Sequence, residues 1–196
     1  MAIKSSLINM VLTLTLICAG ASAAVGVIYA VTKAPIEAAA TAKTNKAIEA
    51  VVPSFNNNPS DDVMTVASEQ GSEPSKVYVA KKDGDIVGYA IESKTTKGFG
   101  GAFIIMVGFT PDGAVYNTSV ISHSETPGLG AKITDGSGKF IQQWKGKNLL
   151  DGSVKTAVRK DGGDIDAITA STITSRAFCD AMERAAKVFD NITESN

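Results

Sequence analysis

A cluster of hydroxyl side chains directly before a predicted helix could bind a phosphate group. Residues 176–191 carry apolar side chains at helical spacing, and the segment before them holds four hydroxyl residues, Thr169, Ser171, Thr172 and Thr174. The first N–H groups of a helix have no acceptor within the helix and lie at the positive end of its dipole, so they attract anions. The sequence therefore predicts a phosphate site at this helix start. An alternative interpretation is that these residues only cap an ordinary core helix.

A second segment, His123 to Gly130, combines polar groups with a flexible loop. Pro127 fixes its own φ angle, whereas Gly128 and Gly130 permit backbone conformations that other residues avoid. Leu129 therefore lies between two flexible points, where its apolar side chain can pack against a flat ring. Taken alone, a Pro-Gly-x-Gly segment is also typical of a plain surface turn.

Together the two segments resemble the motifs of FMN-binding domains in bacterial membrane redox complexes. Residues 166–174 are similar to the signature Asp-x-x-Ser/Thr-Gly-Ala-Ser/Thr-x-Thr, with Ala170 where Gly is usual and Ser171 where Ala is usual. The resemblance implies that a flavin transferase joins the phosphate of FMN to Thr174 as a phosphoester. Ala170 is small enough for a close approach unless its position requires a positive φ, where Gly is strongly preferred.

The loop that ends at Gly130 matches the Glu-Thr-Pro-Gly-Leu-Gly sequence of the same family. The resemblance implies that this loop contacts the isoalloxazine ring, with polar contacts from Glu125 and Thr126 and with Leu129 on the ring face. We interpret His123 as a strand-end residue beside the cofactor. The complete set of expected FMN-binding residues is Asp166, Thr169, Ser171, Thr172, Ile173 and Thr174 from the first segment, and His123, Glu125, Thr126, Gly128, Leu129 and Gly130 from the second.

The N-terminal part of the chain predicts a membrane anchor. Residues 7–31 contain no charged side chain and are long enough to cross a bilayer as a helix. Since the apolar character continues well past Ala21-Ser22-Ala23, we expect an uncleaved anchor rather than a secretory signal. An N-terminal anchor with a short leading tail places the tail, residues 1–6, in the cytoplasm. We therefore expect a single-pass protein of the bacterial inner membrane, with its main domain on the extracytoplasmic side.

About 160 residues follow the anchor, which fits one α+β domain. Residues 32–76 are expected to form a membrane-proximal helix, from Pro35 to Val52, and then an irregular polar segment. Residues 77–196 are expected to form the FMN-binding domain, a mainly antiparallel sheet flanked by helices. Its predicted strands are 77–80, 86–91, 102–109 and 115–122; a bend is expected at 98–101 and a short helix from Gly136 to Trp144.

Composition disfavours several other functions. The 19 basic and 20 acidic residues give no electrostatic footprint for nucleic acid. A single histidine and two distant cysteines do not provide the ligand set of a metal centre, so no metal site is expected. Cys179 is interpreted as a small buried helix residue. We interpret Asp164 and Asp166 as turn and N-cap carboxylates rather than a catalytic pair, and no catalytic residue is expected.

Within the FMN-binding families, the anchor, the domain size and the order of the motifs most resemble the G subunit of the Rnf (Rsx) complex. This resemblance implies an electron carrier with covalent FMN in a membrane complex that moves electrons between ferredoxin and NAD, coupled to ion translocation. The expected partners are the other subunits, the membrane and a flavin transferase. One alternative is the C subunit of a sodium-translocating NADH:quinone oxidoreductase, which usually has a longer extracytoplasmic part. Another is a non-redox anchored binding or assembly module, in which the hydroxyl turn only caps a helix.

Overall fold

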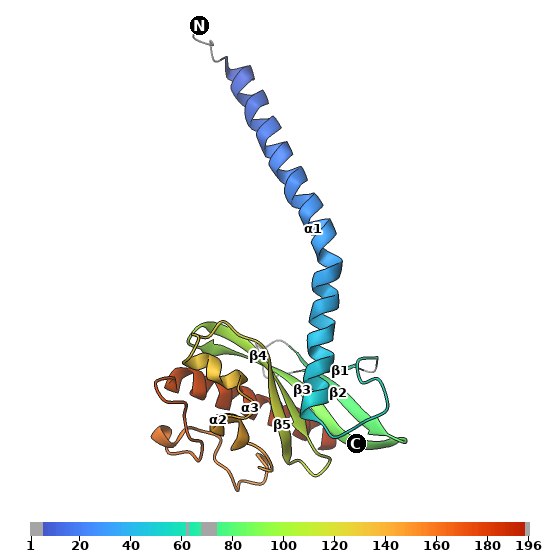
Figure 1. Ribbon diagram of the computed structural model, residues 1–196, viewed down its shortest axis with the longest axis vertical. Coiled ribbons are helices and arrows are strands. Elements are labelled where there is room, and N and C mark those ends of the chain that lie inside the picture. The colour runs from blue at the N-terminus through green and yellow to red at the C-terminus, as the bar shows by residue number, and fades with distance from the viewer. Residues whose placement is uncertain (1–5, 62, 68–73, 195–196) are drawn as a thin grey trace. The chain divides into compact units, whose positions relative to one another are not determined.

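The computed structural model describes residues 6–61, 63–67 and 74–194 (Figure 1). The chain divides into two compact units, Met1–Lys43 and Thr44–Asn196. The described residues form a long helix, five strands, two short helical turns, a short helix and a C-terminal helix: α1 (Leu7–Val51), β1 (Val63–Val66), β2 (Ser75–Lys82), β3 (Asp85–Gly98), β4 (Gly101–Phe109), β5 (Val115–Ser122), η1 (Gly130–Thr134), α2 (Lys139–Gln142), η2 (Arg159–Asp161) and α3 (Thr172–Glu194). The α+β class expected from the sequence is confirmed.

The first unit contains the apolar part of α1, a helix that is long and apolar enough to cross a membrane. The uncharged residues 7–31 alone extend for roughly 38 Å as a helix, more than the ~30 Å hydrocarbon core of a bilayer. The sequence predicted a separate membrane-proximal helix from Pro35, whereas the structure continues one helix through Pro35 to Val51. Proline already has a helical φ and removes only one hydrogen bond, and the Ala-rich residues that follow favour helix strongly enough to continue it.

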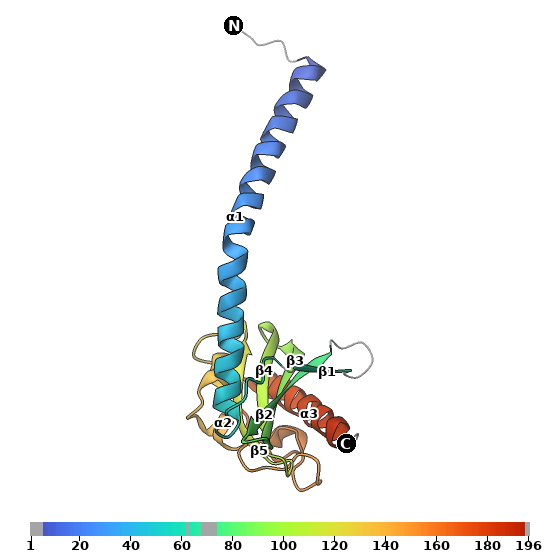
Figure 2. The same ribbon diagram turned by 90° about the vertical axis from the view of Figure 1, so that its right-hand side faces the viewer.

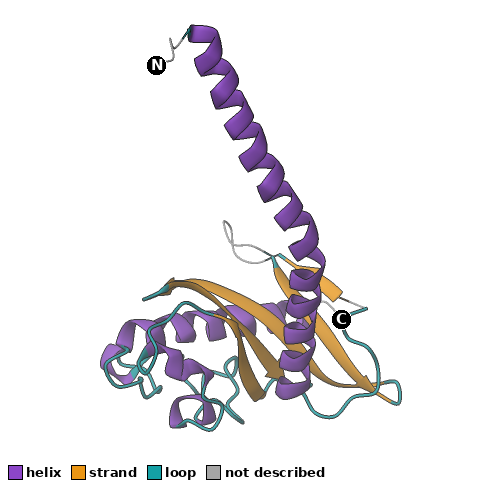
Figure 3. Cartoon of the chain, turned by 45° about the horizontal axis from the view of Figure 1, so that its top comes forward, coloured by secondary structure: helices purple, strands orange, loops and turns teal. Residues whose placement is uncertain are grey.

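The second unit is built on an antiparallel sheet in which each strand pairs with the next along the chain (Figure 3). Asp83 and Gly84 form the β2–β3 turn with positive φ angles of 55° and 100°, as their sequence indicated. Strand β1 lies within the segment that was expected to be irregular, so that expectation was wrong for Val63–Val66, while residues 62 and 68–73 lie outside the described part of the chain. A four-residue edge strand whose first three residues are exposed has no buried alternation to reveal it.

Alternate residues of the strands face two separate cores. Val77 and Val79 of β2 pack with α3, whereas Tyr78 and Ala80 pack with the end of α1. Figure 2 shows α3 on one side of the sheet and the last turns of α1 on the other. These last turns belong to the second unit, and a Cβ added to Gly108 of β4 would collide with the Val51 carbonyl. The compact unit begins at Thr44 and includes the end of α1 together with residues 77–196, the range expected for the FMN-binding domain.

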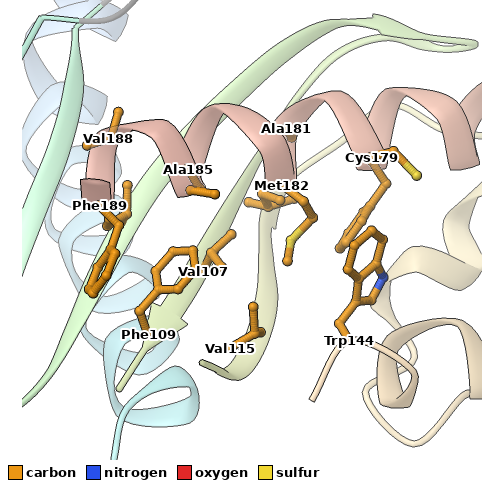
Figure 4. Close-up of a cluster of buried hydrophobic side chains, with 14 of the residues drawn as sticks. Val107, Phe109, Val115, Trp144, Cys179, Ala181, Met182, Ala185, Val188 and Phe189 are labelled. Carbon is orange, nitrogen blue, oxygen red and sulfur yellow. The ribbon is translucent and has the colours of Figure 1, made fainter. Parts of the chain in front are cut away.

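The core on the α3 side fixes the position of that helix against the sheet (Figure 4). The rings of Phe109 and Phe189 stack with their centroids 4.9 Å apart. Trp144 packs against Phe178 with ring centroids 5.8 Å apart. The Ser93 hydroxyl donates a hydrogen bond of 2.8 Å to the Ala181 carbonyl in the buried interface. Since β3 and β4 form this interface with α3, the hairpin that joins them is held close to the start of the helix.

Candidate functional site

Both segments singled out in the sequence meet in one cavity at the start of α3. The cavity has a volume of about 350 Å³. Three parts of the chain line it: the tip of the β3–β4 hairpin, the loop after β5 and the turn into α3. The lining residues are Phe99, Glu125, Thr126, Leu129, Gly130, Ala170, Ser171, Thr172, Ile173 and Thr174. The two motifs, whose residues Glu125 and Thr174 are 49 positions apart in sequence, therefore form a single site.

A hydrogen bond between two buried side chains lies at the centre of this site. The Thr174 hydroxyl donates to Oε2 of Glu125 over 2.8 Å, and the two residues are only 1% and 5% exposed. The other carboxylate oxygen, Oε1, accepts from the Gly100 N–H at 3.2 Å. The Glu125 backbone N–H donates to Nδ1 of His123 over 3.1 Å. These contacts hold the carboxylate against the one hydroxyl that the sequence motif marked as the attachment point.

The first turn of α3 presents free backbone donors in the same place. The first N–H bonded within the helix is that of Ser175, which donates to the Ser171 carbonyl. No acceptor is found in the described part of the chain for the N–H groups of Thr172, Ile173 and Thr174. The Ser175 hydroxyl accepts from the Ile168 N–H and donates to the Ser171 carbonyl, which braces the turn. The helix start can therefore receive a phosphate with three N–H groups already oriented.

Ala170 adopts a left-handed backbone conformation, with a φ of 59°. This is the position where the family signature has Gly. Ala was expected to fit there unless a positive φ was required, and the structure shows that it is required. An L-residue in this region costs about 1–2 kcal/mol relative to the right-handed region, so the turn into α3 is strained at Ala170.

Gly130 provides the space around the central hydrogen bond. A Cβ at this position would lie 2.5 Å from Oε2 of Glu125 and 2.8 Å from Oγ1 of Thr174. A side chain there would cover both oxygens. Gly128 has a different role, because its φ of 75° favours glycine for conformational reasons.

The hairpin tip, residues 98–101, is part of the site, although the sequence indicated only a bend there. Gly100 donates to Glu125, and a Cβ on Gly100 would collide with the Ser124 carbonyl. Phe99 lines the cavity and is 69% exposed. With Leu129 (42% exposed) and Ile173 (49%), it gives the cavity an apolar rim suited to a flat aromatic ring. The sequence signal that could have revealed this part of the site is the aromatic residue within the Gly-rich run 98–101.

Four of the expected residues, Gly128, Asp166, Thr169 and His123, do not line the cavity. Asp166 is exposed, forms an ion pair with Arg159 and donates its N–H to Oε1 of Gln143 over 2.8 Å. Its interpretation as an N-cap was wrong, because α3 begins at Thr172. Thr169 is exposed to solvent, and His123 contacts the site through the Glu125 backbone. Local spacing did not reveal that the chain turns away from the cavity between Asp166 and Ala170.

Comparison with known proteins agrees with this geometry. Residues 98–187 match the model of the FMN-binding domain family. The chain is 36% identical to the G subunit of the ion-translocating oxidoreductase complex of Salmonella typhimurium, over 89% of this chain and 86% of that protein. It is 33% identical to the G subunit of the Na(+)-translocating ferredoxin:NAD(+) oxidoreductase complex of Acetobacterium woodii, over 93% and 91% of the two chains.

The chain belongs to the G-subunit family of ion-translocating oxidoreductase complexes. The resemblance inferred from the two motifs is thereby confirmed. The matched region begins at Gly98, so it includes the hairpin tip as well as both motifs. Since ion translocation takes place across a membrane, the apolar α1 makes this family member a single-pass membrane protein.

Proposed function

We propose that this chain is the electron-carrying subunit of a membrane-bound ferredoxin:NAD oxidoreductase complex that couples electron transfer to ion translocation. The FMN is joined to Thr174 by a phosphoester. One observation carries the proposal: the Thr174 hydroxyl lies in a cavity that combines free helix N–H groups with an apolar rim. The names of the relatives support membership of such a complex rather than of a quinone reductase.

Bound FMN would supply the one-electron and two-electron redox chemistry, and the protein would bind and orient it. The N–H groups of Thr172 and Ile173 would hold the phosphate, with the Ser171 and Thr172 hydroxyls beside them. Leu129 and Phe99 would pack against the ring. Because Phe99 is so exposed, the cavity leaves one side open for electron exchange with neighbouring subunits.

The main domain is proposed to lie on the extracytoplasmic side of the inner membrane. A covalent tether has a physical purpose there, because a dissociated FMN could not be replaced from the cytoplasmic pool. A cysteine introduced at the exposed Lys132 tests the location. It should react with a membrane-impermeant maleimide in intact spheroplasts, and protection until lysis would place the domain in the cytoplasm.

In-gel flavin fluorescence after complete denaturation tests the attachment. The full chain is co-expressed with a flavin transferase and compared with Thr174→Val and Thr169→Val. Wild type and Thr169→Val should fluoresce, because Thr169 is a hydroxyl residue of the same segment outside the cavity. Thr174→Val should not, and a fluorescent Thr174→Val band would refute the attachment site. No flavin on the wild type would favour the non-redox anchored module.

A further inference from the structure

We propose that Glu125 is the general base for attachment of FMN, the group that removes the proton from the Thr174 hydroxyl. The acceptor protein would then supply a catalytic residue for its own modification, while the transferase supplies the activated flavin. This inference rests on the proposed function, because it requires Thr174 to be the attachment point.

The geometry of the pair is that of a nucleophile and its base. The Thr174 Oγ1 to Glu125 Oε2 distance of 2.8 Å lies within the ~2.6–3.2 Å over which a base can abstract a proton. The Thr174 hydroxyl is the donor of this bond, and Oε2 of Glu125 is the acceptor. Its proton therefore already points at Oε2, and the lone pairs of Oγ1 remain available to an electrophile.

The carboxylate of Glu125 has no other evident partner that would explain its burial. None of the ion pairs among the described residues includes Glu125. Its remaining side-chain contact is the Gly100 N–H, which fixes Oε1 and leaves Oε2 directed at Thr174. Burying a carboxylate without a cation is costly, so a purely structural hydrogen bond to a hydroxyl is a poor reason for it.

The cavity reaches both oxygens of the pair. Thr174 and Glu125 each contribute to its lining although both are nearly buried. Gly130 leaves the adjoining space open, because any Cβ there would come within 2.8 Å of both reacting oxygens. A phosphorus atom can therefore approach Oγ1 from the cavity while the proton leaves on the side of Glu125.

The reaction balances without a change of redox state. FMN itself would have to expel an oxide or hydroxide, so the donor must be a flavin dinucleotide, in which the phosphorus belongs to a phosphoanhydride. The Oγ1–P bond forms, the P–O bond of the anhydride breaks, and a nucleoside monophosphate leaves. The Thr174 proton moves to Oε2 of Glu125 and then to solvent. While it stays there, the new phosphodiester anion faces a neutral carboxyl group and avoids repulsion between like charges.

Steady-state flavinylation of the full chain by a purified flavin transferase, with a flavin dinucleotide as donor, tests the proposal. Glu125→Gln keeps the shape and a hydrogen-bond acceptor but removes the basicity. Because a general base contributes about 100-fold or more, kcat should fall by at least that factor, while KM for the acceptor protein stays within about threefold. Asp112→Asn, at an exposed turn away from the cavity, is the control and should keep the wild-type kcat and KM.

A rate for Glu125→Gln within threefold of wild type would overturn the proposal, because it would mean that a hydrogen bond alone is sufficient. If the wild type is flavinylated in the same assay, the proposed attachment at Thr174 stands even when the proposed role of Glu125 fails. The failure of one proposal is therefore distinguishable from the failure of the other. If Glu125→Gln lowers the melting temperature, Glu125→Asp decides. It retains a carboxylate and should react at least tenfold faster than the Gln variant, and equal rates would overturn the proposal.

Discussion

Replacing Ala170 by Gly should stabilise the domain, although Ala→Gly substitutions usually destabilise proteins. The φ of 59° costs an L-residue about 1–2 kcal/mol, a strain that glycine does not have. Glycine in turn loses about 0.4–1 kcal/mol more conformational entropy on folding. Since the Ala170 side chain is exposed, no core packing is lost. The free energy of unfolding should therefore rise by about 0.5–1 kcal/mol.

Trp144 makes this change measurable. It is the only tryptophan of the chain, it is completely buried, and it contacts Phe178 of α3. Its fluorescence therefore reports unfolding of the domain in the full-length, detergent-solubilised protein. A gain of about 0.5–1 kcal/mol should raise the melting temperature by about 1–4 °C in a unit of this size.

Ala167→Gly is the matched control, because Ala167 is an exposed residue of the same segment without a positive φ. It should lower the free energy of unfolding by about 0.4–1 kcal/mol through the unfolded-state entropy alone. If Ala170→Gly destabilises the domain as much as Ala167→Gly does, the reasoning from backbone strain is wrong.

Two further variants probe the ring contact and the buried thiol. Leu129→Asp should leave the covalent flavin in place but shift its visible absorbance and lower its potential, because a carboxylate beside the ring disfavours the added electron; an unchanged spectrum and potential would exclude the contact. Burial raises the pKa of the Cys179 thiol from 9.0 to about 12, so its contribution to stability is complete below pH 9 and is lost as the pH rises toward 12. Cys179→Ala should therefore show a shallower loss of melting temperature between pH 9 and 12 than wild type, and identical pH profiles would contradict the assigned burial.

Much of this protein followed from local sequence. The uncharged stretch 7–31 predicts a membrane helix because its length and apolarity, which are local properties, are sufficient for a helix to cross a bilayer. Asp83-Gly84 predicts a tight turn for a similar reason, since Asp and Gly adopt positive φ angles more readily than most residues. The hydroxyl run that ends at Thr174 and the loop around Leu129 indicated a flavin site through their resemblance to known motifs.

Only the tertiary structure decided how these parts combine. Packing of α3 against β3 and β4 brings Gly100 and Phe99 to the helix start, and the same packing buries Glu125 against Thr174. No periodicity encodes such contacts, because they join residues far apart in sequence through a shared core. The strain at Ala170 was likewise hidden, since one residue type can occupy different regions of φ and the surrounding fold selects among them.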